Sequence, residues 1–162
     1  MKLRDVLWSL DLWCAIGAAV ATFYLLPSAP RADFAKDLYG VGISVLSIVF
    51  AVYFAALAII MASPDDDFIT FMEEEGDYSR LIANLRFTQW ALFIALIASL
   101  ALYGWTANQV STKTEVQSKA WLVSFVFLFS YSLFSAGAAI HDAIQYSKYR
   151  TRFLRIMKKK PD

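Results

Sequence analysis

The stretch YGVGISVLSIVFAVYFAALAIIMA, Tyr39 to Ala62, contains no charged residue and is long enough to cross a lipid bilayer as a helix. Three further apolar stretches share this character: VLWSLDLWCAIGAAVATFYLL (6–26), FTQWALFIALIASLALYGW (87–105) and AWLVSFVFLFSYSLFSAGAAI (120–140). None alternates apolar and polar residues as the strands of a membrane barrel do. The sequence therefore predicts an all-α integral membrane four-helix bundle, one domain over residues 1–162, with helices at about 6–26, 39–62, 80–106 and 119–157.

The composition agrees with a membrane protein. Hydrophobic residues make up 59% of the chain and charged residues 18%, below the quarter or so that is usual in soluble domains. The first apolar stretch resembles a signal peptide, but Asp11 interrupts it and it exceeds the usual apolar length. We therefore expect a retained transmembrane helix. Cys14 is the single cysteine, so no disulfide can form within the chain.

The distribution of basic residues predicts the orientation. Eleven of the fifteen Lys and Arg residues lie in the N-terminus, the middle loop and the C-terminus. Because basic residues are enriched on the inner side of a membrane, both termini are expected in the cytoplasm. The fourth helix should then extend into the cytoplasm, and the inner (plasma) membrane of a bacterium is the expected location.

The middle loop, Ser63 to Arg86, contains a predicted short helix and an acidic cluster. Ser63, Pro64 and the acids that follow suit a helix start, and the apolar residues from Phe68 to Met72 could lie on the membrane surface. The runs DDD and EEE lack the alternating spacing of a calcium loop, so no metal is expected. In a symmetric oligomer the cluster would form an acidic vestibule. Its members are Asp65, Asp66, Asp67, Glu73, Glu74, Glu75 and Asp77.

The second helix carries a stripe of small residues along one face. They recur every three or four positions: Gly40, Ser44, Ser47, Ala51, Ala55, Ala58 and Ala62. Small residues let helices approach closely in lipid. The stripe is therefore expected to pack, within one subunit or between subunits, in preference to lining a pore.

Four ionisable residues are expected at the cytoplasmic boundary of the bundle: Asp11, Arg86, His141 and Asp142. A carboxylate such as Asp11 is costly to leave facing lipid and should turn inward. Asp11 and Arg86 are the first expected pair, with His141 or Asp142 in contact with one of them. This cluster could act as a polar gate, since histidine titrates near neutral pH; alternatively, the residues only end their helices.

The fourth helix has a polar face and a basic end. The polar face, which Asp142 continues, comprises Ser124, Tyr131, Ser135 and Gln145 and could line water. The basic end is expected to bind the anionic inner leaflet through Arg150, Arg152, Arg155, Lys158, Lys159 and Lys160. A nucleic-acid partner is not expected for a basic tail that directly follows a membrane helix.

No motif for nucleophilic, metal or dinucleotide chemistry occurs, so neither an enzyme nor a cofactor is expected. The adjacent His141 and Asp142 are not a catalytic pair, because neighbouring helical residues point about 100° apart. The first hypothesis is a small homo-oligomeric ion channel or transport protein with a charged cytoplasmic gate. The second is a non-conducting membrane sensor, effector or scaffold that docks a cytosolic protein through its acidic loop and basic tail.

Overall fold

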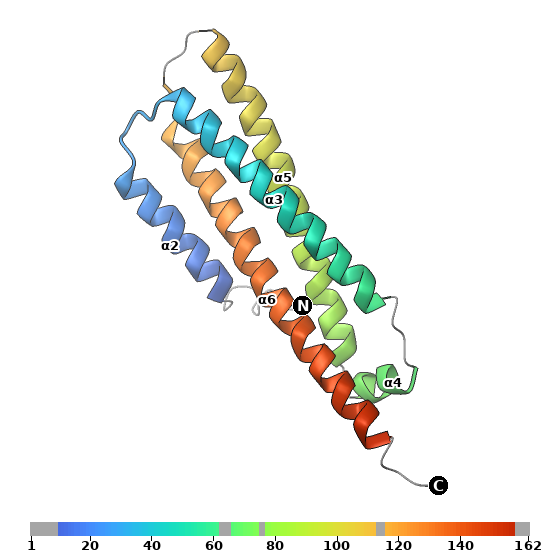
Figure 1. The fold of residues 1–162 in the computed structure, drawn as a ribbon. Coiled ribbons are helices and arrows are strands. Elements are labelled where there is room, and N and C mark those ends of the chain that lie inside the picture. Colours follow the sequence, from blue (N-terminus) through green and yellow to red (C-terminus); the bar gives the residue numbers. More distant parts are fainter. Residues whose placement is uncertain (1–9, 62–65, 75–76, 113–115, 158–162) are drawn as a thin grey trace.

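The computed structural model describes residues 10–61, 66–74, 77–112 and 116–157, and these residues form five helices (Figure 1). They are α2 (Leu10–Leu25), α3 (Ala32–Met61), α4 (Asp66–Glu74), α5 (Asp77–Ser111) and α6 (Lys119–Met157). Within the described ranges the only β-type pairing is an isolated antiparallel bridge between Arg31 and Val116. The chain is therefore all-helical where it is described.

Two helices are longer than their apolar stretches. The helix expected from residue 39 is α3, which begins at Ala32, where Ala32 and Ala35 are buried and the Ala35 amide donates to the Arg31 carbonyl (3.1 Å). The helix expected over 80–106 is α5, which runs from Asp77 to Ser111. Both helices thus extend past their apolar segments into polar sequence.

Three helices, α3, α5 and α6, are long and apolar enough to cross a membrane, while α2 is a shorter apolar helix. Large apolar side chains are exposed on the outer surfaces of these helices, among them Trp90, Ile97 and Trp121. Exposed apolar surface on this scale is unusual for a soluble monomer. These properties indicate a membrane protein.

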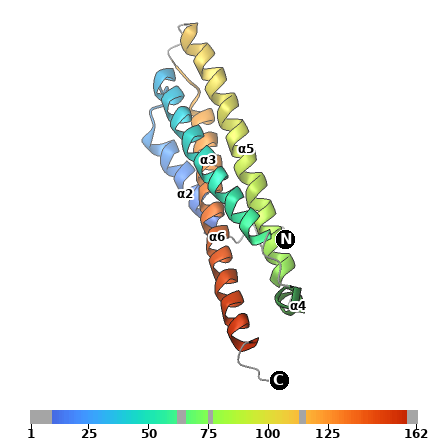
Figure 2. The same ribbon diagram turned by 45° about the vertical axis from the view of Figure 1, so that its right-hand side comes forward.

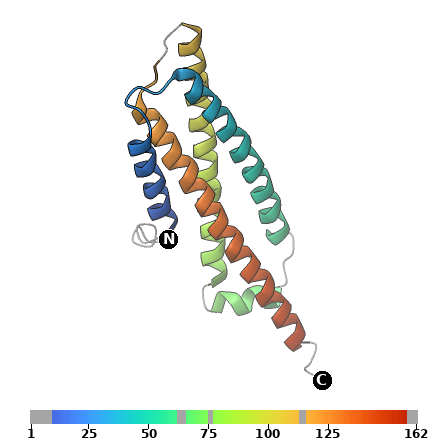
Figure 3. The same ribbon diagram turned by 60° about the vertical axis from the view of Figure 1, so that its left-hand side comes forward.

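The helices pack side by side and run alternately up and down (Figures 1 and 2). α3 packs mainly against α5, α5 packs against α6, and α2 packs against α6. Within the part of the chain that the structure describes, α2 has no comparable contact with α3 or α5, and Figure 3 shows it beside α6. The four apolar helices therefore do not form a ring of equal contacts: α2 lies outside a group made by α3, α5 and α6.

Buried residues recur at alternating spacings of three and four on α5 and α6. On α5 this series is Leu81, Leu85, Thr88, Leu92, Ala95 and Ser99; on α6 it is Leu122, Phe125, Ser132, Ala136, Ala139 and Tyr146, with Phe129 partly buried between them. Thr106 of α5 and Ser135 of α6 are buried as well. This spacing is that of the seam of a left-handed coiled coil. Many members are small, which permits close approach of helices in lipid.

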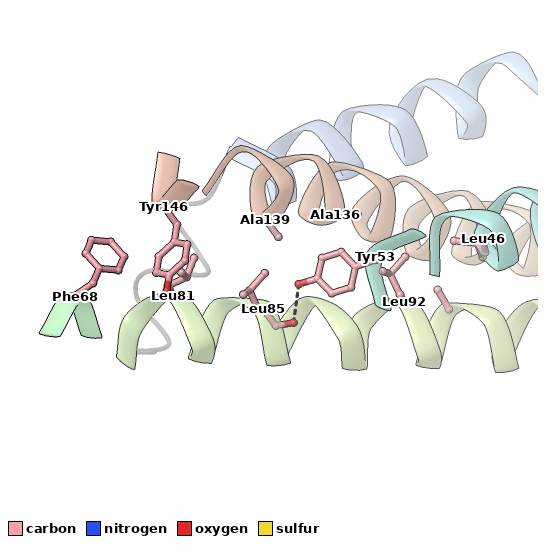
Figure 4. Close-up of a cluster of buried hydrophobic side chains, with 10 residues drawn as sticks. Leu46, Tyr53, Phe68, Leu81, Leu85, Leu92, Ala136, Ala139 and Tyr146 are labelled. Carbon is pink, nitrogen blue, oxygen red and sulfur yellow. Dashed lines mark hydrogen bonds between the residues drawn. The ribbon is translucent and has the colours of Figure 1, made fainter. Parts of the chain in front are cut away.

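The core is continuous from the middle of the molecule to α4 (Figure 4). At that end the Phe68 ring is fully buried against the rings of Tyr146 (centroids 5.3 Å apart) and Phe153 (5.5 Å) of α6. The Phe68 side of α4 is thus covered by protein, whereas the sequence suggested that this apolar face would lie on the membrane surface. Below we call this end of the molecule the α4 end, and the opposite end, where α2 joins α3 and α5 joins α6, the loop end.

Candidate functional site

Polar side chains join α3, α5 and α6 inside the apolar core, toward the α4 end. The Tyr53 hydroxyl of α3 donates to the Leu85 carbonyl of α5 (2.8 Å), as Figure 4 shows. One turn along α5, Thr88 Oγ1 lies 3.0 Å from Ser135 Oγ of α6, and both side chains are buried (3% and 6% exposed). A hydrogen bond in an apolar medium satisfies groups that water cannot reach. These contacts therefore fix the three helices in register.

Two half-buried carboxylates lie on helices that pack against each other, Asp11 on α2 and Asp142 on α6. The negative charge of Asp142 acts on Asp11. Tyr131 of α6 is half-buried as well. Buried or half-buried polar side chains thus occur on all four apolar helices: Asp11, Tyr53, Thr88, Tyr131, Ser135 and Asp142.

Arg86 and His141 do not belong to this set. Arg86 is exposed on the outer side of α5, where it lines a surface hollow of about 510 Å³ with Phe87 and Trp90. His141 is exposed and lies 3.4 Å from the Gln145 amide nitrogen. Among the described residues the only ion pair is Arg31–Asp33 (3.6 Å).

The expected Asp11–Arg86 ion pair is therefore corrected. Leu85 faces the core, and the next residue on a helix points about 100° away, so Arg86 faces outward. The same rotation separates His141 from Asp142. Of the four ionisable residues expected at the boundary, the two acids are half-buried, whereas Arg86 and His141 are exposed.

The polar face expected on α6 is divided between different surroundings. Ser124 is exposed near the loop end, while Tyr131 is half-buried and stacks on Phe127 (centroids 6.2 Å apart, 9° between planes). Ser135 is buried against α5, and Gln145 is half-buried beside His141. The residues of this face therefore differ in their exposure and in the side chains that they contact, so they do not form one continuous exposed surface in the single chain.

The small-residue stripe of α3 is mostly exposed. Gly40 is half-buried near Tyr103, whereas the other described members are exposed: Ser44, Ser47, Ala51, Ala55 and Ala58. Ala62 lies outside the described residues. α3 uses an adjacent face for packing within the chain, with Tyr39, Leu46 and Tyr53 buried every seven residues. The stripe therefore does not pack against other helices of the same chain, apart from Gly40, and it lies on the outer surface of the chain.

The acidic cluster is partly described. Glu73 is exposed and accepts hydrogen bonds from the Ser79 amide (3.1 Å) and hydroxyl (2.5 Å), which stabilise the start of α5. Glu74 is exposed; Asp66, Asp67 and Asp77 lie in α4 and α5, and Asp65 and Glu75 lie outside the described residues. In the described ranges no group of three or more His, Cys, Asp or Glu side chains could hold a metal ion.

The basic residues of α6 face different directions. Arg152 and Arg155 are exposed, while Arg150 is half-buried and its Nε atom has no hydrogen-bond partner. Lys158, Lys159 and Lys160 lie outside the described residues. The basic end of α6 is therefore not a uniform cationic tail where it is described.

The loop end holds a polar network that sequence reasoning missed. The Thr106 hydroxyl donates to Gln117 Oε1 (2.8 Å), and Gln117 Nε2 lies 3.4 Å from the Tyr39 hydroxyl. The backbone N–H of Gln117 donates to the Pro30 carbonyl (2.9 Å). Nearby, Lys119 Nζ donates to the Leu26 carbonyl (2.8 Å) and lies 4.5 Å from the Phe23 ring centroid. The seven-residue spacing of Tyr39, Leu46 and Tyr53 in the sequence could have indicated that the two tyrosines are buried on one face of α3.

No protein-family model, curated protein or solved structure matches this chain. Chemically, two carboxylates that repel each other in a partly buried site favour binding of a proton or another cation between them.

Proposed function

We propose that the chain is a small integral protein of the inner membrane that forms a homo-oligomeric channel or transporter for protons or other cations. The observation that carries the proposal is the presence of two half-buried carboxylates, Asp11 and Asp142, on the packed apolar helices α2 and α6. Carboxylates in apolar helices are costly, and they commonly mark ion or proton pathways. In this proposal the two acids form the charged gate.

The exposed stripe of α3 supports the homo-oligomer. Ser47, Ala51 and Ala55 present little side-chain volume on a surface that is otherwise covered by large apolar groups. In lipid such a face gains more from close contact with another helix than from contact with acyl chains. A second copy of the chain is the proposed occupant, and the pathway would lie at or near the contact between subunits.

The proposed orientation puts the α4 end in the cytoplasm, as the distribution of basic residues favours. The gate then lies near the inner surface, with α4 and its acids beyond it. There the exposed carboxylates Glu73 and Glu74 would raise the local concentration of cations at the entrance.

The test is ion flux through the purified full chain in liposomes, under a proton gradient and separately under a potassium gradient, with the subunit number measured in nanodiscs. The proposal expects flux of at least one cation and more than one subunit. A monomer without flux under either gradient would overturn it. That result would favour the non-conducting sensor or scaffold. Its proposed docking surface is α4, which packs on α6 through Phe68.

A further inference from the structure

A stripe of hydrogen-bond donors follows one face of α6 at its α4 end. His141, Gln145, Lys148, Arg152 and Arg155 recur at spacings of four, three, four and three, which keeps them on one side of a helix. The lower part of this stripe lines a surface hollow of about 480 Å³, together with Ser147, Tyr149 and Thr151. Three positive charges and several neutral donors thus face one concave region.

No ion pair among the described side chains neutralises the charges of this hollow. Lys148, Arg152 and Arg155 are exposed, and the one ion pair among the described side chains is Arg31–Asp33 at the opposite end. Asp142, the acid of α6, is half-buried. Among the side chains that the structure describes, the hollow therefore has positive charge and no counter-ion.

The position of the stripe along α6 indicates its surroundings. A hydrocarbon layer of about 30 Å takes roughly 20 helical residues, so a span that starts near Ala120 ends near Ile140. Gln145 and Lys148 then come within the first few turns after the apolar layer. Side chains on a helix tilt toward its N-terminus, which on α6 is toward the bilayer, and long basic side chains extend to lipid phosphates.

We propose that Gln145 and Lys148, with Arg152 one turn further, form a binding site for the phosphate group of an anionic phospholipid of the leaflet at the α4 end, and that Arg155 adds positive charge beyond it. Lys148, Arg152 and Arg155 supply charge, and the Gln145 amide adds a neutral donor. The site is distinct from the general attraction of a basic tail, because it uses one face of α6 and excludes the half-buried Arg150. It depends on membrane placement of the chain and not on ion conduction.

The test is native mass spectrometry of the purified full chain, titrated with phosphatidylglycerol and, separately, with zwitterionic phosphatidylcholine. The variant Lys148→Gln/Arg152→Gln/Arg155→Gln is compared with Lys158→Gln/Lys159→Gln/Lys160→Gln, which removes the same charge. Each cation near a membrane surface contributes about five-fold in affinity. We expect the first variant to lose roughly a hundred-fold in phosphatidylglycerol affinity, the second to lose only a few-fold, and phosphatidylcholine binding to stay unchanged.

Equal losses in the two variants would overturn the proposal, because they would show general charge attraction alone. Displacement of the lipid by an equal concentration of inorganic phosphate would also overturn it, by assigning the site to a free anion. A change in subunit number with unchanged lipid affinity would assign the stripe to a contact between copies. If the triple variant does not fold, as judged by its helical circular dichroism, Lys148→Gln alone replaces it, with Lys158→Gln as its control.

Discussion

The two ends of the molecule treat polar groups in opposite ways. At the loop end, the buried side chains of Tyr39, Thr106 and Gln117 are joined to one another, and Lys119 is held by the Leu26 carbonyl and the Phe23 ring. At the α4 end, the carboxylates Asp11 and Asp142 are half-buried without an ion pair, and three cations of α6 have no ion-pair partner among the described side chains. At the loop end, hydrogen bonds between polar groups hold the helices together. At the α4 end, charged groups remain able to bind other molecules.

This difference agrees with a general property of functional sites. Groups that bind ions or ligands are often arranged at some cost to stability, and neighbouring structure compensates for that cost. Changes at the loop end and in the aromatic cluster should therefore weaken the fold, whereas neutralisation of an acid at the α4 end should not.

Replacement of Phe68 by alanine should release α4 from α6. The ring is fully buried against Tyr146 and Phe153, and loss of a buried phenylalanine costs about 3 kcal/mol. Hydrogen–deuterium exchange of residues 66–74 should then accelerate by roughly a hundred-fold. Phe71→Ala is the control, because Phe71 is 53% exposed, and a larger effect of that variant would contradict the packing described here.

Gly42→Ala should destabilise the loop-end half of α3 by about 2 kcal/mol. A methyl group at this position would overlap the Phe125 ring, whose Cε2 atom would lie 2.9 Å away, and that ring is held by Tyr39 (centroids 4.8 Å apart). The melting temperature in detergent measures the effect. Gly104→Ala has open space around it and should leave stability unchanged or slightly raised, since alanine favours helix; equal losses in both variants would refute the close contact.

Asp142→Asn should stabilise the fold slightly, by no more than about 0.5 kcal/mol after solvent screening. The change removes the repulsion between Asp11 and Asp142 while the side-chain shape is kept. Thermal unfolding in detergent at neutral pH provides the measurement, and Asp11→Asn should act in the same direction. A clear loss of stability in both variants would mean that the carboxylates hold the helices together instead.

The sequence predicts the helical class well, because long uncharged stretches have few alternatives to a membrane helix. Contacts between distant residues are harder to predict. The link between Gln117 and the Pro30 carbonyl depends on how two loops meet, and no local pattern marks it. The sequence indicates how deep Arg86 lies along its helix but not which way its side chain points. Because the neighbouring Leu85 faces the core, Arg86 points outward.

The small-residue stripe shows a similar limit. Its spacing identifies a face suited to packing, but not which helix covers it, and α3 packs through the neighbouring face of Tyr39, Leu46 and Tyr53. The larger buried residues on that face were the better guide to contacts within the chain. The stripe is accordingly assigned, in the proposal above, to a second copy.

Cation flux in liposomes, compared among the native chain, Asp142→Asn and the matched variant Asp33→Asn, tests the central claim most directly. Asp33 is an exposed carboxylate at the loop end, paired with Arg31, so its loss changes the net charge by the same amount. The account predicts flux in the native chain, at least a ten-fold reduction in Asp142→Asn without loss of stability, and little change in Asp33→Asn. Flux that is equal in all three proteins would contradict a gate formed by Asp11 and Asp142.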